Sequence, residues 1–209
     1  MNRRRLEALE HRLVRARPTC LCLLTFCPQM GQTMPPLDVV CDRCGLWRDS
    51  QSRREEALPV LLKGFSAFRA TGAEVRVPSY VGLLGDAYTQ STRFEDARKA
   101  LNEGLAVAEK NDDRCHEAEL HRLKGELHVA ESRDETAAED CFRRAIETAR
   151  RQQSKGWELR ATMSLARLWQ RQGRRDEARH ALAAIYGTYT EGFTTPDLVD
   201  AKALLETLA

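Results

Sequence analysis

Residues 117–150 read EAELHRLKGELHVAESRDETAAEDCFRRAIETAR and contain two apolar stripes separated by the short polar stretch Glu131–Asp134. Apolar side chains that recur every three or four residues lie on one face of a helix. The segment therefore predicts two amphipathic helices, 117–131 and 135–150, folded back on each other as a helical hairpin. The first stripe is Leu120, Leu123, Leu127 and Ala130, and the second is Ala138, Phe142, Ala145 and Ala149.

The same arrangement returns about every 40 residues along the chain. An alanine near the start of the second helix is followed by a large apolar residue four positions later, and by another packing residue seven positions later. A fixed period of this size is typical of stacked copies of one unit, and it indicates a protein-binding surface rather than a single reactive centre. The alanines are Ala57, Ala97, Ala138 and Ala178, which are followed by Leu61, Leu101, Phe142 and Leu182, and then by Gly64, Gly104, Ala145 and Ile185.

The period divides the chain into four hairpins and a final helix. Helices are expected over 37–49 and 53–70, 76–90 and 93–110, and 155–172 and 174–187 in addition to the central pair. Pro59 is expected to kink the helix over 53–70 or to delay its start. Thr195, Pro196 and Asp197 favour the start of a helix over 196–208, which would cap the apolar end of the array. We therefore predict an all-α helical-hairpin solenoid over 37–209, with hairpins at about 37–70, 74–110, 113–153 and 155–187, a cap over 196–208, and a poorly defined basic segment over 1–36.

The residue types within the hairpins resemble the tetratricopeptide repeat. Leu84-Gly85-x-x-Tyr88, followed by Ala97, Leu101 and Gly104, carries the resemblance most clearly, and the segments around Gly125 and Trp169 are similar. Small residues at these positions let paired helices approach closely, and large apolar residues fill the space to the next pair. The resemblance implies a right-handed solenoid that binds a protein or peptide in its concave groove.

The period exceeds the usual tetratricopeptide length of about 34 residues. Over residues 53–209 the chain resembles the C-terminal repeats of large bacterial regulators, in which an ATPase module, often with an adenylate/guanylate cyclase domain, precedes the repeats. This resemblance implies a scaffold or sensor in cytoplasmic signalling, with an ATPase/cyclase module encoded nearby. The chain itself has no Gly-x-x-x-x-Gly-Lys-Ser/Thr phosphate loop, so we expect it to be neither an enzyme nor a cofactor binder.

The charged residues nearly cancel, to a net charge of +2, although residues 1–54 hold ten Arg or Lys against five acids. The near balance makes a nucleic-acid partner improbable. No apolar run approaches the roughly 20 residues that span a bilayer, so no membrane partner is expected. An odd number of seven cysteines favours a reduced cytoplasm over a disulfide framework.

The cysteines support one alternative function. Cys22, Cys27, Cys41 and Cys44 form a C-x4-C-x13-C-x2-C pattern, close to the spacing of zinc sites, and would make the chain a zinc-binding regulatory protein. The competing interpretation places Cys41 and Cys44 on the packed face of a repeat helix. Elsewhere, Cys115-His116 is interpreted as the start of a helix rather than as a catalytic dyad.

The candidate binding residues lie on the first helix of each hairpin, off the packed stripe, where side chains one turn apart would point into the groove. The last hairpin contributes mainly arginines and is expected to form a basic wall suited to an acidic partner. The candidates are Asp86 and Gln90 from the second hairpin, Glu119, Arg122 and Glu126 from the third, and Arg160, Met163, Arg167 and Arg171 from the fourth.

Overall fold

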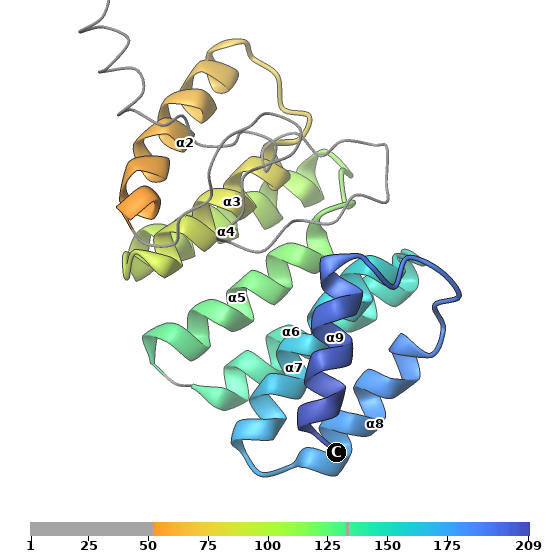
Figure 1. Cartoon of the computed structure of the whole chain (residues 1–209). Coiled ribbons are helices and arrows are strands. Elements are labelled where there is room, and N and C mark those ends of the chain that lie inside the picture. The colour runs from red at the N-terminus through yellow and green to blue at the C-terminus, as the bar shows by residue number, and fades with distance from the viewer. Residues whose placement is uncertain (1–51, 133) are drawn as a thin grey trace, which may run out of the picture.

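The computed structural model describes residues 52–132 and 134–209, and in these residues every regular element is an α-helix (Figure 1). The expectation of an all-α fold is therefore confirmed for this part of the chain. The helices are α2 (Ser52–Ala70), α3 (Val77–Gln90), α4 (Phe94–Lys110), α5 (Glu117–Glu131), α6 (Glu135–Arg151), α7 (Lys155–Arg171), α8 (Arg175–Tyr186) and α9 (Pro196–Thr207).

The helix boundaries agree with the sequence-based expectation to within one residue at every end. Local patterns set them, because apolar periodicity and turn residues act over a few positions. The expected helix over 37–49 lies outside the described residues. Pro59 does not delay α2, which begins at Ser52, seven residues before the proline.

Consecutive helices pack as hairpins, and the hairpins pack in sequence (Figure 1). Helix α3 contacts α5, α5 contacts α7, and α7 contacts α9, so these four helices form a continuous layer, here called the inner layer. Within the described residues α4 does not contact α6, and α6 does not contact α8, so the second helices are spread apart. The first helices of successive hairpins therefore touch one another, whereas the second helices do not.

The repeated alanines and their large apolar partners form the core of each hairpin. Ala97, Ala138 and Ala178 have no exposed surface, and Leu101, Phe142 and Leu182 are at most 1% exposed. Gly85 approaches Leu101 so closely that a Cβ on the glycine would lie 2.6 Å from the leucine side chain. At Gly125 in the next hairpin the same Cβ would lie 2.4 Å from the Phe142 ring. The close approach that the small residues were expected to allow is present in both hairpins.

The repeat pattern is weaker at α2. Gly64 is exposed, with open space where its side chain would be, unlike the buried Gly104 at the equivalent position of α4. Helix α2 instead packs on α3 through Leu58, Leu61 and the two phenylalanines of its second half.

Helix α9 caps the other end of the array. It contacts both helices of the preceding hairpin, α7 and α8. In the same way, α5 contacts α3 and α4, and α7 contacts α5 and α6. Leu198, Ala201, Leu204 and Leu208 are buried in one cluster with the apolar residues of α7 and α8. Thr195 precedes the helix as expected, but its side chain makes no capping hydrogen bond.

Candidate functional site

The middle of the inner layer carries a buried ion pair. The Arg122 guanidinium donates to both carboxylate oxygens of Glu119, one turn earlier on α5, with two contacts of 2.8 Å. Both side chains are only 12–13% exposed. Arg160 of α7 reaches the same carboxylate at 3.0 Å and so joins the third hairpin to the fourth.

A hydroxyl extends this arrangement across the α5–α7 interface. Ser164 of α7 donates to Glu126 at 2.6 Å, and Arg122 donates to both the Glu126 carboxylate at 3.2 Å and the Ser164 hydroxyl at 3.3 Å. We call Glu119, Arg122, Glu126, Arg160 and Ser164 the inner-layer network. Because a buried charge is costly unless it is paired, the network holds these side chains in one arrangement.

Burial and neighbouring charges shift the pKa values of Glu119 and of two carboxyl groups near the network. Burial alone would raise the pKa of Glu119, but the guanidinium groups of Arg122 and Arg160 outweigh burial and hold the pKa below its ordinary value. Burial raises the pKa of Asp86 on α3, and a hydrogen bond of 2.7 Å from the Gln90 amide only partly opposes this. Burial also raises the pKa of Asp197 at the start of α9.

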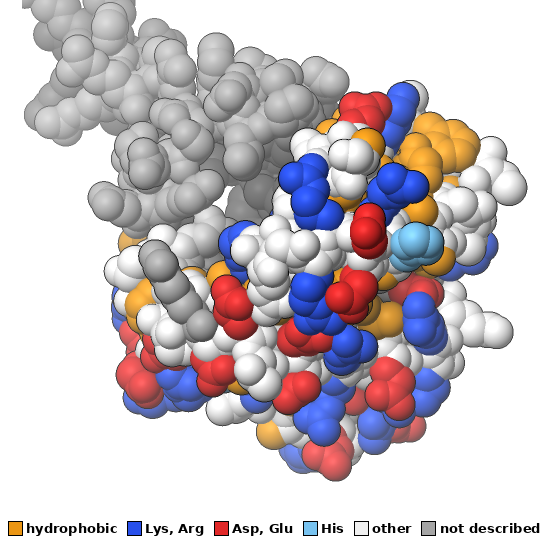
Figure 2. Space-filling model, turned by 90° about the horizontal axis from the view of Figure 1, so that it is seen from below, with side chains coloured by type: hydrophobic (Ala, Val, Ile, Leu, Met, Phe, Trp, Pro, Cys, Tyr) orange, Lys and Arg blue, Asp and Glu red, His pale blue; other side chains and the backbone are white. Residues whose placement is uncertain are grey.

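The arginines of α7 do not form a continuous basic wall. Arg160 is bound to Glu119 and lies 5.2 Å from the centre of the Trp157 ring, whereas Arg167 and Arg171 are exposed. Among the described residues, no acidic side chain forms an ion pair with either exposed arginine. The face seen in Figure 2 likewise mixes acidic and basic side chains instead of gathering one sign.

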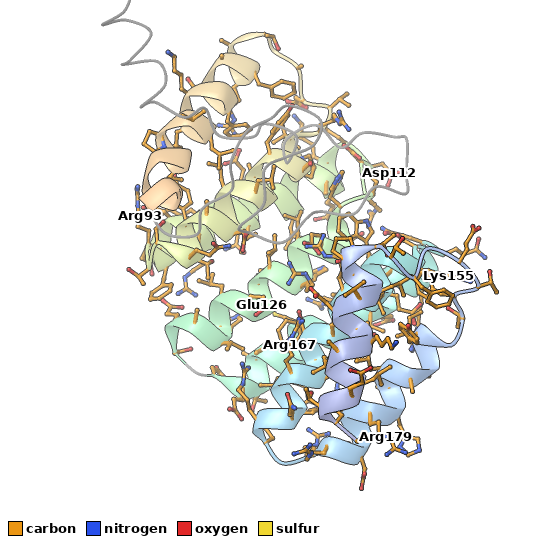
Figure 3. All side chains as sticks on the ribbon, viewed as in Figure 1. Arg93, Asp112, Glu126, Lys155, Arg167 and Arg179 are labelled. Carbon is orange, nitrogen blue, oxygen red and sulfur yellow. The ribbon has the colours of Figure 1, made fainter. Side chains whose placement is uncertain are left out.

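Met163 was expected to face the groove, and this expectation is wrong. Its side chain is 4% exposed and belongs to the cluster that includes Leu198 and Ala201 of α9. The cap packs on α7 and covers the position that an open trough would have left accessible. The remaining candidates lie on α3, α5 and α7, and Figure 3 labels Glu126 and Arg167 among them.

The sequence pattern missed a concave region at the loops that join one hairpin to the next. A pocket of about 750 Å³ lies there, lined by Arg76, Asp113, Cys115, His116 and Trp157 among others. The Cys115 sulfur lies 3.2 Å from His116 Nδ1, but burial and the neighbouring Asp113 raise the pKa of the thiol to about 11. A thiol with this pKa is protonated near neutral pH and is a poor nucleophile.

The proposed zinc ligands Cys22, Cys27, Cys41 and Cys44 lie outside the described residues. In the residues that the structure does describe, no three His, Cys, Asp or Glu side chains are grouped so that they could hold a metal ion. No described helix combines the length and apolar character needed to cross a bilayer.

A comparison with known proteins finds no family model that matches the chain and no similar curated protein. The geometry of the inner layer and of the loop pocket is therefore the basis for any functional assignment.

Proposed function

We propose that this chain is a protein-interaction module, a right-handed tetratricopeptide-like solenoid that binds a segment of a partner along its inner layer. The single observation that supports the proposal most is the order of helix contacts. Each first helix touches the next first helix, while the second helices are spread apart. In stacked hairpins this arrangement leaves an extended surface on the inner layer, which repeat proteins use for binding.

The charges on α7 suggest the chemistry of the partner. Arg167 and Arg171 are exposed one turn apart and are not neutralised by any described residue. A guanidinium group binds a carboxylate through two parallel hydrogen bonds, which makes an acidic peptide or an acidic partner domain the best match. The inner-layer network, which joins α5 to the first half of α7, would border this contact, but its charges are paired within the network.

The biological setting follows from the resemblance of the repeats and is part of the same proposal. The chain would act in the cytoplasm as the sensor or scaffold end of a bacterial signalling regulator, without catalysis or a cofactor of its own. Its partner would then be an ATPase/cyclase module encoded nearby.

A site-specific crosslinking experiment tests the proposal. A photo-crosslinking amino acid at position 167 should capture a partner in the native cells, whereas the same amino acid at Arg179, exposed on the outer helix α8, should not (Figure 3). Arg171→Glu should reduce the capture at position 167, and Arg179→Glu should leave it unchanged. Equal capture at both positions, or no effect of Arg171→Glu, would show that the inner layer does not bind this partner.

The cysteine spacing keeps a zinc-binding regulatory protein as a second candidate. Purified protein would then contain about one zinc ion per chain, and Cys41→Ser with Cys44→Ser would remove it. A zinc content well below one per chain in protein purified without chelators would exclude this candidate.

A further inference from the structure

The loop pocket brings together three parts of the chain that are far apart in sequence. Its walls come from the loop before α3, the loop before α5 and the first turn of α7. The volume of about 750 Å³ lies within the range of sites that bind small molecules, roughly 300–1,000 Å³. Figure 3 labels Asp112, on the loop before α5, and Lys155, the first residue of α7.

Three of the potentially charged groups on the pocket wall are already neutral or neutralised. The Glu74 carboxylate accepts from Lys110 at 2.9 and 3.1 Å and from the Asn111 amide at 2.9 Å. Burial lowers the pKa of His116, so the imidazole is mainly neutral near pH 7. Cys115 carries a protonated thiol, as described above.

Arg76 and Asp113 differ from these groups because neither forms an ion pair with a described residue. Among the described residues, Asp113 accepts hydrogen bonds from the backbone N–H of Arg76 at 3.4 Å and from the Cys115 thiol at 2.9 Å. A carboxylate has about four acceptor positions, so it can accept further hydrogen bonds. The Arg76 side chain is exposed, and it donates no hydrogen bond to a described residue. The pocket therefore presents one positive and one negative group that do not neutralise each other directly.

Two large apolar side chains, Val75 and Trp157, also line the pocket. Val75 is 72% exposed, the largest exposure among the large hydrophobic residues of the described region. The Trp157 indole is held in place by a hydrogen bond of 3.1 Å from Nε1 to the carbonyl oxygen of Cys115. Its ring centre lies 5.9 Å from that of His116, so the two rings form a fixed aromatic surface.

We propose that this pocket binds a free α-amino acid with a branched or aromatic side chain. The ligand carboxylate pairs with the Arg76 guanidinium, the ligand ammonium pairs with the Asp113 carboxylate, and the side chain packs against Val75 and Trp157. A zwitterion with an apolar side chain matches all three features, whereas a simple anion, a simple cation or a neutral hydrocarbon matches only one or two.

If the proposed function holds, a small molecule bound at this site would regulate the interaction module. The pocket lies at the N-terminal ends of α3, α5 and α7, the helices of the proposed binding surface, so occupancy would stabilise their relative positions. The binding itself requires no protein partner, so a failure of the amino-acid proposal can be distinguished from a failure of the proposed function.

Calorimetric titration of the whole chain with L-phenylalanine and L-leucine tests the proposal, together with N-acetyl-L-phenylalanine and L-phenylalaninamide. We expect the free amino acid to bind and each blocked analogue to bind about tenfold more weakly, because each lacks one charge-assisted contact. Arg76→Gln should bind L-phenylalanine no more tightly than L-phenylalaninamide, but still more tightly than N-acetyl-L-phenylalanine. Asp113→Asn should bind L-phenylalanine no more tightly than N-acetyl-L-phenylalanine, but still more tightly than L-phenylalaninamide.

Arg179→Gln and Asp176→Asn, both at exposed positions of α8, are the matched controls and should bind like the unmodified chain. Thermal unfolding of each variant verifies that the protein is folded. The blocked analogues test the charge preference on the unmodified protein, so the outcome does not depend on any variant folding.

Absence of binding at 10 mM amino acid, a concentration far above typical ligand affinities of about 1 mM or tighter, would overturn the proposal. Equal binding of free and blocked forms would also overturn it.

Discussion

At the scale of single residues, the hairpins depend on glycines that face large apolar side chains. Gly85 faces Leu101 and Gly125 faces Phe142, and in each case a methyl group would overlap the partner. The Phe142 side chain is 1% exposed, so it has no free space into which it can retreat. Overpacked cores lose stability because side chains and backbone must move away from their preferred positions.

Gly125→Ala should therefore lower the free energy of unfolding by about 1–3 kcal/mol. Gly64→Ala is the matched control, because Gly64 is also helical but its side-chain position is open, and alanine should stabilise that helix by about 0.5–1 kcal/mol. Urea denaturation of both variants measures the difference. Adding Phe142→Leu to Gly125→Ala should recover part of the loss, and a similar effect of alanine at both glycines would contradict the close approach.

A second residue-scale prediction concerns His121, which is 9% exposed. Burial lowers its pKa to about 4, and the positive charges of Arg144, Lys124 and Arg151 act in the same direction. These effects prevail even though a carboxylate oxygen of Glu117 lies 4.0 Å from His121 Nε2. The unfolded chain takes up this proton near the ordinary pKa of about 6.5. Between these values the imidazole of His121 holds more protons in the unfolded state, so its contribution lowers stability as the pH decreases from about 6.5 toward 4.

His121→Gln should flatten this decrease by up to about 1.4 kcal/mol per pH unit. The half-buried carboxyl groups of Asp86 and Asp197, whose pKa values are raised, remain in both proteins, so their opposite contributions cancel in the comparison. Urea denaturation at several pH values between 4.5 and 7 measures the slopes. His180→Gln, at an exposed position of α8, should keep the slope of the unmodified chain, and identical slopes in all three proteins would refute the assignment.

At the scale of elements, two turns between paired helices share one design. The backbone N–H of Arg93 donates to the Tyr88 carbonyl and that of Arg174 to the Trp169 carbonyl, each at 2.9 Å. The residue before each arginine adopts a left-handed conformation, Thr92 with φ 57° and Gly173 with φ 80°. This combination is the Schellman motif that ends many helices.

The arginine of each turn also binds its surroundings in the same way. The Arg93 guanidinium lies 4.7 Å from the centre of the Tyr88 ring and donates to Asp96 at 2.8 Å. The Arg174 guanidinium lies 4.7 Å from the centre of the Trp169 ring and donates to Glu177 at 2.9 Å. One sequence signature, aromatic-x4-Arg-x2-acid, thus sets the geometry of both turns.

The two left-handed residues predict opposite effects of substitution. Left-handed backbone costs a β-branched residue about 1–2 kcal/mol, so Thr92→Gly should stabilise the protein by up to about 1 kcal/mol after the entropy of glycine is counted. Gly173→Ala should destabilise it by about 1 kcal/mol, although no atom lies within 4 Å of the new methyl group. Thermal unfolding measures both changes, and a shift in the same direction for the two variants would contradict this account.

At the scale of the whole molecule, each helix of the described region contacts, among the described helices, only the next one or two in sequence. Proteins built in this way lose structure locally, beginning where neighbouring contacts are removed. The end next to α9 is a direct test, because α7 and α8 are the described helices on which α9 packs its apolar side chains.

Leu198→Ala removes a side chain that is 3% exposed and should cost about 2–4 kcal/mol. The next residue, Val199, is 48% exposed, so Val199→Ala should change stability by less than about 0.5 kcal/mol. Hydrogen exchange should accelerate in α7 and α8 of Leu198→Ala before it accelerates in α3 and α4. Uniform acceleration along all helices would indicate a single cooperative core instead.

Local patterns in the sequence determined the helices, their boundaries and the buried faces of the hairpins. Ala97, Ala138 and Ala178 are buried as expected, because the spacing of apolar and small residues acts over one or two helical turns. The inner layer also carries Asp86, Glu119, Arg122 and Arg160 on the expected helices. Their role in binding a partner stays a prediction.

Only the tertiary structure decided which side chains of the inner layer remain accessible and which are paired. Met163 is covered because α9 returns over α7, and Arg160 is bound to a carboxylate 41 positions earlier in the chain. The loop pocket likewise unites Arg76, Asp113 and Trp157, which no local spacing relates. Helical periodicity fixes the direction in which a side chain points from the axis of its own helix. The neighbour that it meets depends on how the separate helices pack, and that is a property of the whole array.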